Sequence, residues 1–148
     1  MLFVDNFGNS LDFDVVGYEF EENKSAKDED TKDFDWDANW LTIKIIYDKG
    51  GFKQEYSSSC ILTMELKDFV LDLEKLNNGE IDSCELNAFE PYLKMSAKKD
   101  KGCVEFHIEY IFGRSRQEKL AFTSNLSNTE FDYILKEMKE LSAKYKVR

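Results

Sequence analysis

The order of two hydrophobic periodicities along the chain is the feature that most constrains its fold. Apolar residues recur at every second position over much of residues 2–57 and again over residues 81–126, the period of strands with one buried face. They recur at helical spacing over residues 64–77 and 128–144. Because strands and helices do not alternate along the chain as in repeated βαβ units, the sequence predicts an α+β fold. We expect a single antiparallel β-sheet of about seven or eight strands with two amphipathic helices packed on it.

Local signals mark the turns and irregularities of the expected strands. Asp48-Lys49-Gly50-Gly51 predicts a hairpin turn between two strands. The apolar residues change parity near Val15-Val16-Gly17, which predicts a β-bulge, because one extra residue reverses the inward face. A strand is also expected over residues 81–88, ahead of the clearest strand at residues 103–112.

Other signals mark the ends of the two expected helices. Thr63 is the expected N-cap of the first helix, which closes at Asn77-Asn78-Gly79, residues that tolerate the left-handed conformation. The second helix opens with a capping box, Ser127-x-x-Glu130. Both helices carry one continuous apolar face, so we expect both faces to belong to the core.

The charge of the chain indicates what it can bind. Its 30 acidic and 20 basic residues give a net charge of −10. We expect no binding to nucleic acid or to anionic membranes, because both require clustered Lys and Arg. A strongly acidic protein instead favours a basic partner, towards which its electric field speeds association.

We expect one domain, residues 1–148, in the cytoplasm. A chain of 148 residues can bury a core without disulfides or metal. No apolar run approaches the roughly 18 residues of a membrane span, and the first residues lack the pattern of a signal peptide. Cys60, Cys84 and Cys103 form no Cys-x-x-Cys motif and are odd in number, so free thiols are expected.

Negative charge is concentrated between Glu19 and Asp37, where nine acidic residues accompany three lysines. Residues 21–33 include almost no apolar side chain and are expected to form a mobile, exposed loop. The residues expected to contact a basic partner are Glu21, Glu22, Asp28, Glu29, Asp30, Asp33 and Asp35. Two alternatives remain open. One is that this segment only keeps the protein soluble. The other is that the contact surface lies on the outer sheet face that carries Glu105, His107 and Glu109.

Patterns associated with catalysis or metal binding are incomplete in this chain. The acidic run from Asp33 resembles the start of an EF-hand loop, but Ala38 and Lys44 stand where that loop needs Gly and Glu. His107 is the sole histidine, and alternation places it between two glutamates on a solvated strand face, a commonplace arrangement. The chain contains no dinucleotide fingerprint, P-loop or nucleophile elbow. We therefore expect no catalytic residue, no metal site and no cofactor.

Four stretches, in this order and spacing, resemble the WapI family of bacterial immunity proteins. They are Gly17-Tyr18-Glu19-Phe20, Asp37-Ala38-Asn39-Trp40-Leu41, Cys60-Ile61-Leu62-Thr63-Met64-Glu65-Leu66 and Phe89-Glu90-Pro91-Tyr92-Leu93. The resemblance implies a cytoplasmic antidote to a wall-associated or contact-dependent toxin. Such an antidote binds the C-terminal toxin domain, typically a nuclease, and inhibits it by occlusion.

The residues themselves suit that implied function. Carboxylates can pair with the Lys and Arg that a nuclease uses to grip phosphates. Within the resembling stretches, a structural role is expected for Asp37, Asn39, Trp40, Glu90 and Pro91, with Trp40 packing at a strand start and Asp37 and Asn39 bonding local backbone. The expected state is a monomer or weak homodimer. The alternatives are a small-ligand-binding or enzyme domain with a pocket between the sheet and the helices, and a purely structural subunit of a homo-oligomer.

Overall fold

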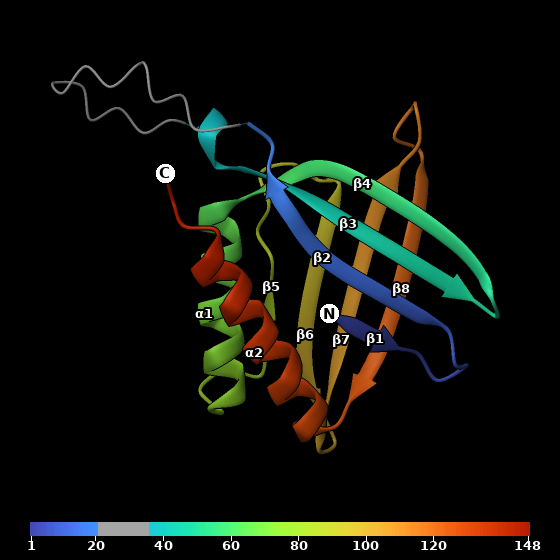
Figure 1. The fold of residues 1–148 in the computed structure, drawn as a ribbon. Helices are drawn as coiled ribbons and strands as arrows, with labels where there is room; N and C mark the ends of the chain where they lie inside the picture. Colours follow the sequence, from blue (N-terminus) through green and yellow to red (C-terminus); the bar gives the residue numbers. More distant parts are fainter. Residues whose placement is uncertain (21–35) are drawn as a thin grey trace, which may run out of the picture.

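The computed structural model describes residues 1–20 and 36–148, in which the chain forms two four-stranded sheets and two α-helices (Figure 1). The first sheet contains, in order, β1 (Leu2–Val4), β2 (Ser10–Tyr18), β3 (Trp40–Lys49) and β4 (Phe52–Leu62). The second contains β5 (Ser83–Glu85), β6 (Leu93–Asp100), β7 (Cys103–Phe112) and β8 (Glu118–Leu126). The helices are a short 3₁₀ helix, η1 (Asp37–Asn39), and the α-helices α1 (Thr63–Asn77) and α2 (Asn128–Lys144).

The predicted α+β class is confirmed, but the prediction of a single sheet is wrong. Every pairing is antiparallel and joins strands that are neighbours in the chain. Helix α1 follows β4 directly, and the next strand, β5, starts a second sheet instead of extending the first. Alternation in a sequence identifies the buried face of a strand, but it does not say which sheet the strand joins.

Phe106 on β7 marks the place where the parts of the core meet. Its ring centroid lies 4.9 Å from that of Phe3 on β1 and 6.3 Å from that of Phe69 on α1. All three side chains are at most 2% exposed. One core therefore connects both sheets and α1.

Helices α1 and α2 run antiparallel along one side of the sheets (Figure 1). Their apolar faces are buried, as the helical spacing predicts, through Leu66, Phe69, Val70, Leu73 and Leu76 on α1 and Phe131, Ile134, Leu135 and Met138 on α2. Polar contacts join their outer sides: the Asn77 side-chain nitrogen donates to the Asp132 carboxylate at 3.1 Å, and the Lys139 ammonium donates to the Glu74 carboxylate. Within residues 1–20 and 36–148, no helix is long and apolar enough to cross a membrane.

Several local predictions can be compared directly with the structure. The β2–β3 register shifts between Val15 and Gly17, which confirms the bulge. The capping box of α2 is formed, with the Ser127 amide donating to Glu130 at 2.7 Å and the Glu130 amide donating to the Ser127 hydroxyl at 3.2 Å. The β3–β4 hairpin turns through Gly50 and Gly51, whose positive φ values of 62° and 90° suit a tight turn.

Two boundary predictions are wrong. Thr63 is the first residue of α1 and not its N-cap, because its hydroxyl donates to Asn39 and the Glu65 carboxylate caps the helix instead. The strand expected over residues 81–88 is limited to Ser83–Glu85. It pairs on one side only, with β6, since it is the edge strand of its sheet.

Candidate functional site

The structure places only part of the predicted site. The predicted partner contacts Glu21, Glu22, Asp28, Glu29, Asp30, Asp33 and Asp35 lie outside the described residues. Asp37 and Asn39 belong to η1, and the partly exposed Trp40 begins β3. Glu90 and Pro91 lie in the turn ahead of β6, where Pro91 is exposed. The motif residues around Asn39 and around Glu90 are thus on two separate connections, and each connection contacts the start of α1.

Asn39 connects η1 to α1 and to the end of the chain. Its side chain is fully buried. The side-chain oxygen accepts hydrogen bonds from the Thr63 hydroxyl at 2.6 Å and from the Arg148 amide at 2.8 Å. The side-chain nitrogen donates to the Arg148 backbone oxygen, also at 2.8 Å. The side chain therefore bonds backbone 109 residues away, in addition to holding the first residue of α1.

Further contacts fix the segment that follows α2 against β2. The Tyr145 hydroxyl donates to the Val15 backbone oxygen at 3.0 Å, and the Tyr18 hydroxyl donates to the Lys146 backbone oxygen at 2.7 Å. The guanidinium carbon of Arg148 lies 3.4 Å from the centroid of the Tyr18 ring, a cation–π contact. Residues 145–148 are consequently held in one position, although no periodicity in the sequence indicated any structure there.

Glu65 holds the connection around Glu90 to the start of α1. One carboxylate oxygen accepts from the Leu62 amide at 2.8 Å, and the other accepts from the Phe89 amide. Burial raises the pKa of this half-buried carboxyl above its ordinary value of 4.5, even though both amide hydrogen bonds oppose the shift. Glu65 therefore ties the start of α1 to the Phe89-Glu90-Pro91-Tyr92 turn.

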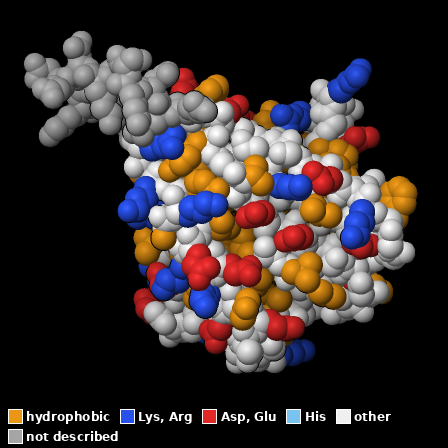
Figure 2. All heavy atoms as spheres, in the orientation of Figure 1, with side chains coloured by type: hydrophobic (Ala, Val, Ile, Leu, Met, Phe, Trp, Pro, Cys, Tyr) orange, Lys and Arg blue, Asp and Glu red, His pale blue; other side chains and the backbone are white. Residues whose placement is uncertain are grey.

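An acidic cleft of about 380 Å³ lies between β2 and α2. The carboxylates that line it are Asp12, Asp14, Glu137 and Glu140. Two cationic groups oppose them: the Met1 amine, which lies 3.0 Å from Asp12 and 3.5 Å from Glu137, and Lys144. Figure 2 shows acidic side chains gathered over the surface where α2 passes beside β2. No pattern in the sequence identified this cleft, because its residues come from a strand and a helix that are more than 100 residues apart in the chain.

A second hollow, of about 500 Å³, opens on the outer face of the second sheet and includes His107 and Glu109. His107 Nε2 donates to Glu109 at 3.2 Å, because a carboxylate can only accept, and Nδ1 lies 2.7 Å from the Thr123 hydroxyl. The hydrogen bond from His107, together with nearby Lys119, lowers the pKa of Glu109. The outer face thus carries a connected row of polar side chains.

This row resembles a nucleophile, base and carboxylate in order, but its position does not suit catalysis. Thr123 lies in the middle of β8, paired with His107 across the sheet, and not on the sharp turn that exposes a hydrolase nucleophile. Among the described residues, no three His, Cys, Asp or Glu side chains gather as metal ligands do.

The chain belongs to the Immunity protein WapI-like family, whose model matches residues 2–146. This match confirms the resemblance and gives the chain an immunity role against a toxin. The search of curated proteins found no match.

The chain aligns with several solved structures, including the three that follow. The plant transcriptional regulator PBF-2 aligns with a TM-score of 0.47 and 12% identity over 93% of this chain and 76% of that one. WHY3 from Arabidopsis thaliana aligns with a TM-score of 0.47 and 13% identity over 93% of this chain and 82% of that one. WHY1 from Arabidopsis thaliana aligns with a TM-score of 0.45 and 16% identity over 94% of this chain and 80% of that one. All three scores are below 0.5, so these likenesses carry no inference about function.

Proposed function

We propose that this chain is a cytoplasmic antidote that binds the C-terminal domain of a wall-associated or contact-dependent toxin and inhibits it by covering a basic surface. The observation that carries the proposal is the family match over residues 2–146 in a chain whose net charge is −10. Nucleases hold phosphates with clustered Lys and Arg, so a nuclease is the toxin that an acidic inhibitor suits best. The antidote acts as a monomer or weak homodimer and needs no cofactor and no catalytic residue.

Two acidic regions are available for this contact. The first is the set of seven carboxylates proposed from the sequence, Glu21, Glu22, Asp28, Glu29, Asp30, Asp33 and Asp35. The second is the cleft between β2 and α2, where Asp12, Asp14 and Glu140 are exposed. Charged surfaces of this kind act mainly on the association rate, because they steer a partner of opposite charge before contact.

The experiment requires the C-terminal domain of the cognate toxin, which is to be sought in a large toxin gene directly upstream of the gene for this chain. Co-expression of the two proteins should give a complex that survives purification and lacks toxin activity. Stopped-flow association at increasing salt concentration then compares two matched triple variants, Asp28→Lys/Glu29→Lys/Asp30→Lys and Asp12→Lys/Asp14→Lys/Glu140→Lys. Both change the net charge by the same amount. The variant that alters the contact surface should associate more slowly and show a flatter salt dependence.

Comparison of the two triple variants separates the effect of charge at the contact surface from the effect of net charge. Equal slowing by both variants would indicate that net charge alone matters. Unchanged rates in both would contradict the acidic-surface mechanism and would direct attention to the outer sheet face with Glu105, His107 and Glu109. Circular dichroism of each variant confirms that the fold is retained.

A further inference from the structure

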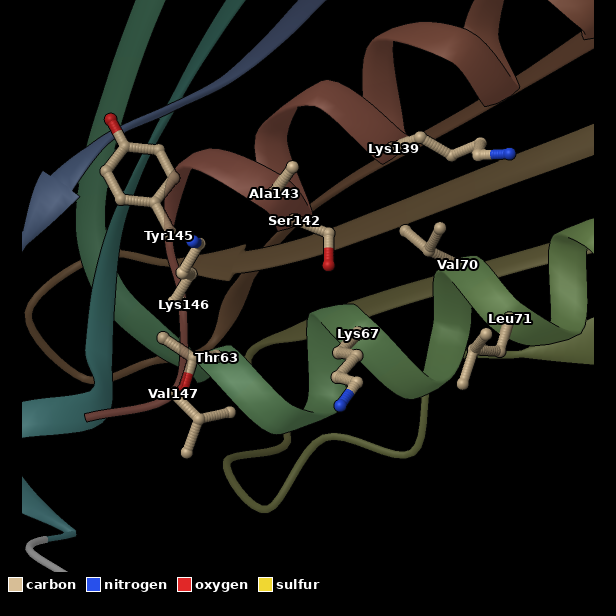
Figure 3. A pocket seen from close by; sticks show the side chains of 10 residues that line it. All are labelled: Thr63, Lys67, Val70, Leu71, Lys139, Ser142, Ala143, Tyr145, Lys146 and Val147. Atoms are coloured by element: carbon tan, nitrogen blue, oxygen red, sulfur yellow. The ribbon is translucent and has the colours of Figure 1, made fainter.

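A groove of about 480 Å³ runs between α1 and α2 and is closed at one end by the segment that follows α2 (Figure 3). Its walls include Lys67 and Leu71 from α1, Ala143 from α2, and Lys146 and Val147 from the terminal segment. The groove therefore depends on the contacts of Asn39, Tyr18 and Tyr145 that fix residues 145–148.

Apolar side chains in this groove are open to solvent. Leu71 is 46% exposed and Val147 is 44% exposed, and Ala143 is also exposed. The three lie on different elements but share one groove. An apolar partner would remove this surface from water, at roughly 25 cal/mol for each Å² that it covers.

The charge of the groove is opposite to that of the chain. Among the described residues, the charged side chains that line it are those of Lys67, Lys139 and Lys146, with no Asp or Glu. Lys139 is paired with Glu74. Within residues 1–20 and 36–148, the ammonium groups of Lys67 and Lys146 form no ion pair. In a protein with a net charge of −10, this arrangement places the ammonium groups of Lys67 and Lys146 beside an apolar surface.

We propose that the groove binds an acidic amphipathic segment of the toxin, with its apolar side chains on Leu71 and Val147 and its carboxylates on Lys67 and Lys146. The part of α1 that lines the groove, from Thr63 to Leu71, is about 12 Å long, which suits a helix of two to three turns laid between α1 and α2. Assignment of the segment to the toxin rests on the proposed function, whereas the preference for an acidic, apolar chain rests on the groove alone. An acidic surface that binds basic residues of the toxin, together with a basic groove that binds an acidic segment, would fix the orientation of the toxin and raise its affinity.

Two other occupants fit these observations less well. A second copy of the chain would bring together two molecules that each carry a charge of −10. Nucleic acid would leave the apolar groove surface uncovered, because it binds mainly through its phosphates. An acidic peptide segment satisfies both the lysines and the apolar side chains.

The first test uses synthetic peptides of about 14 residues as probes, so it does not depend on the toxin. One peptide carries Leu along one helical face and Glu elsewhere, the second has the same composition without a continuous apolar face, and the third replaces every Glu with Lys. We expect saturable binding of the first peptide only, with amide NMR shifts at Ala143 and Val147. Equal binding of the second peptide, stronger binding of the third, or no binding of the first would overturn the proposal.

Variants then locate the binding. Lys67→Glu/Lys146→Glu should weaken binding of the acidic peptide at least about tenfold, because two ion pairs become repulsive contacts. Leu71→Asp should weaken it as well. The matched control is Lys49→Glu/Lys53→Glu, which makes the same charge change in the distant β3–β4 hairpin and should leave the affinity within about twofold. If both double variants weaken binding equally, the groove is not the site.

The final step repeats the comparison with the toxin domain. Faster dissociation of the toxin from the Lys67→Glu/Lys146→Glu variant, but not from the control, is the expected result. If that variant loses the peptide and keeps the toxin unchanged, assignment of the segment to the toxin is wrong. If the unmodified chain binds no toxin, the proposed function fails, and this outcome is distinct from a failure of the peptide test.

Discussion

Replacement of Asn39 by alanine perturbs the contact that holds both η1 and the end of the chain to α1. The side chain is fully buried and makes three hydrogen bonds with Thr63 and Arg148. Each such bond contributes about 1 kcal/mol net, and a buried donor left without a partner costs about 1–3 kcal/mol more. Water can reach the exposed Arg148 but not Thr63, which is 1% exposed. We therefore expect Asn39→Ala to lower the free energy of unfolding by about 3–4 kcal/mol.

Urea denaturation followed by circular dichroism measures this loss. The matched control is Asn125→Ala on the exposed face of β8, which should change the free energy of unfolding by no more than about 0.5 kcal/mol. A double-mutant cycle with a chain that lacks residues 146–148 adds a sharper test. Two of the three bonds end on Arg148, so Asn39→Ala should cost about 1–2 kcal/mol less in the shortened chain. A loss below about 1 kcal/mol in the full chain, or equal losses in both chains, would refute the reasoning.

Three further predictions concern other contacts. Because burial raises the pKa of Glu65, the folded state holds that proton more tightly than the unfolded chain does. As the pH rises from 4.5 through the raised pKa, the free energy of unfolding of the unmodified protein should therefore fall relative to that of the Glu65→Gln variant. A difference between their urea midpoints that stays constant over this pH range would contradict the prediction. Gly113 has a φ of +89°, so Gly113→Ala should lower the free energy of unfolding by about 1–2 kcal/mol in the same urea assay. The control is Gly17→Ala, whose added Cβ meets nothing within 4 Å and which should lower it by no more than about 0.5 kcal/mol. Burial raises the pKa of the Cys60 thiol to about 11, so at neutral pH a thiol reagent should modify Cys60 only when the protein unfolds. Rapid reaction of all three thiols in the native protein would show that Cys60 is not buried.

Much of the local structure could be predicted from periodicity. The helical faces, the bulge beside Val15, the hairpin after β3 and the capping box at Ser127 all follow from residues close together in the chain. Alternation along β7 also placed His107 and Glu109 on the outer face, where the structure joins them by a hydrogen bond. These features depend on neighbours within a few residues, for which sequence patterns carry direct information.

The features that position the candidate site depend on distant residues. Nothing near Asn39 in the sequence indicates that its amide pairs with Arg148, because the partner lies 109 residues away. The division into two sheets was missed for a similar reason, since β4 and β5 each satisfy the strand pattern whether or not they pair. The groove and the acidic cleft arise only when α2 packs beside α1 and β2, and their lining residues come from elements that are far apart in the sequence.

The central claim is that this chain neutralises a toxin by direct binding. The measurement that tests it most directly is titration of the purified C-terminal domain of the cognate toxin with this protein, while toxin activity and heat of binding are followed together. The account predicts that activity is lost at the same stoichiometric end point as the heat signal, and that raising the salt concentration slows association. Full toxin activity in the presence of excess protein, with no heat of binding, would contradict it.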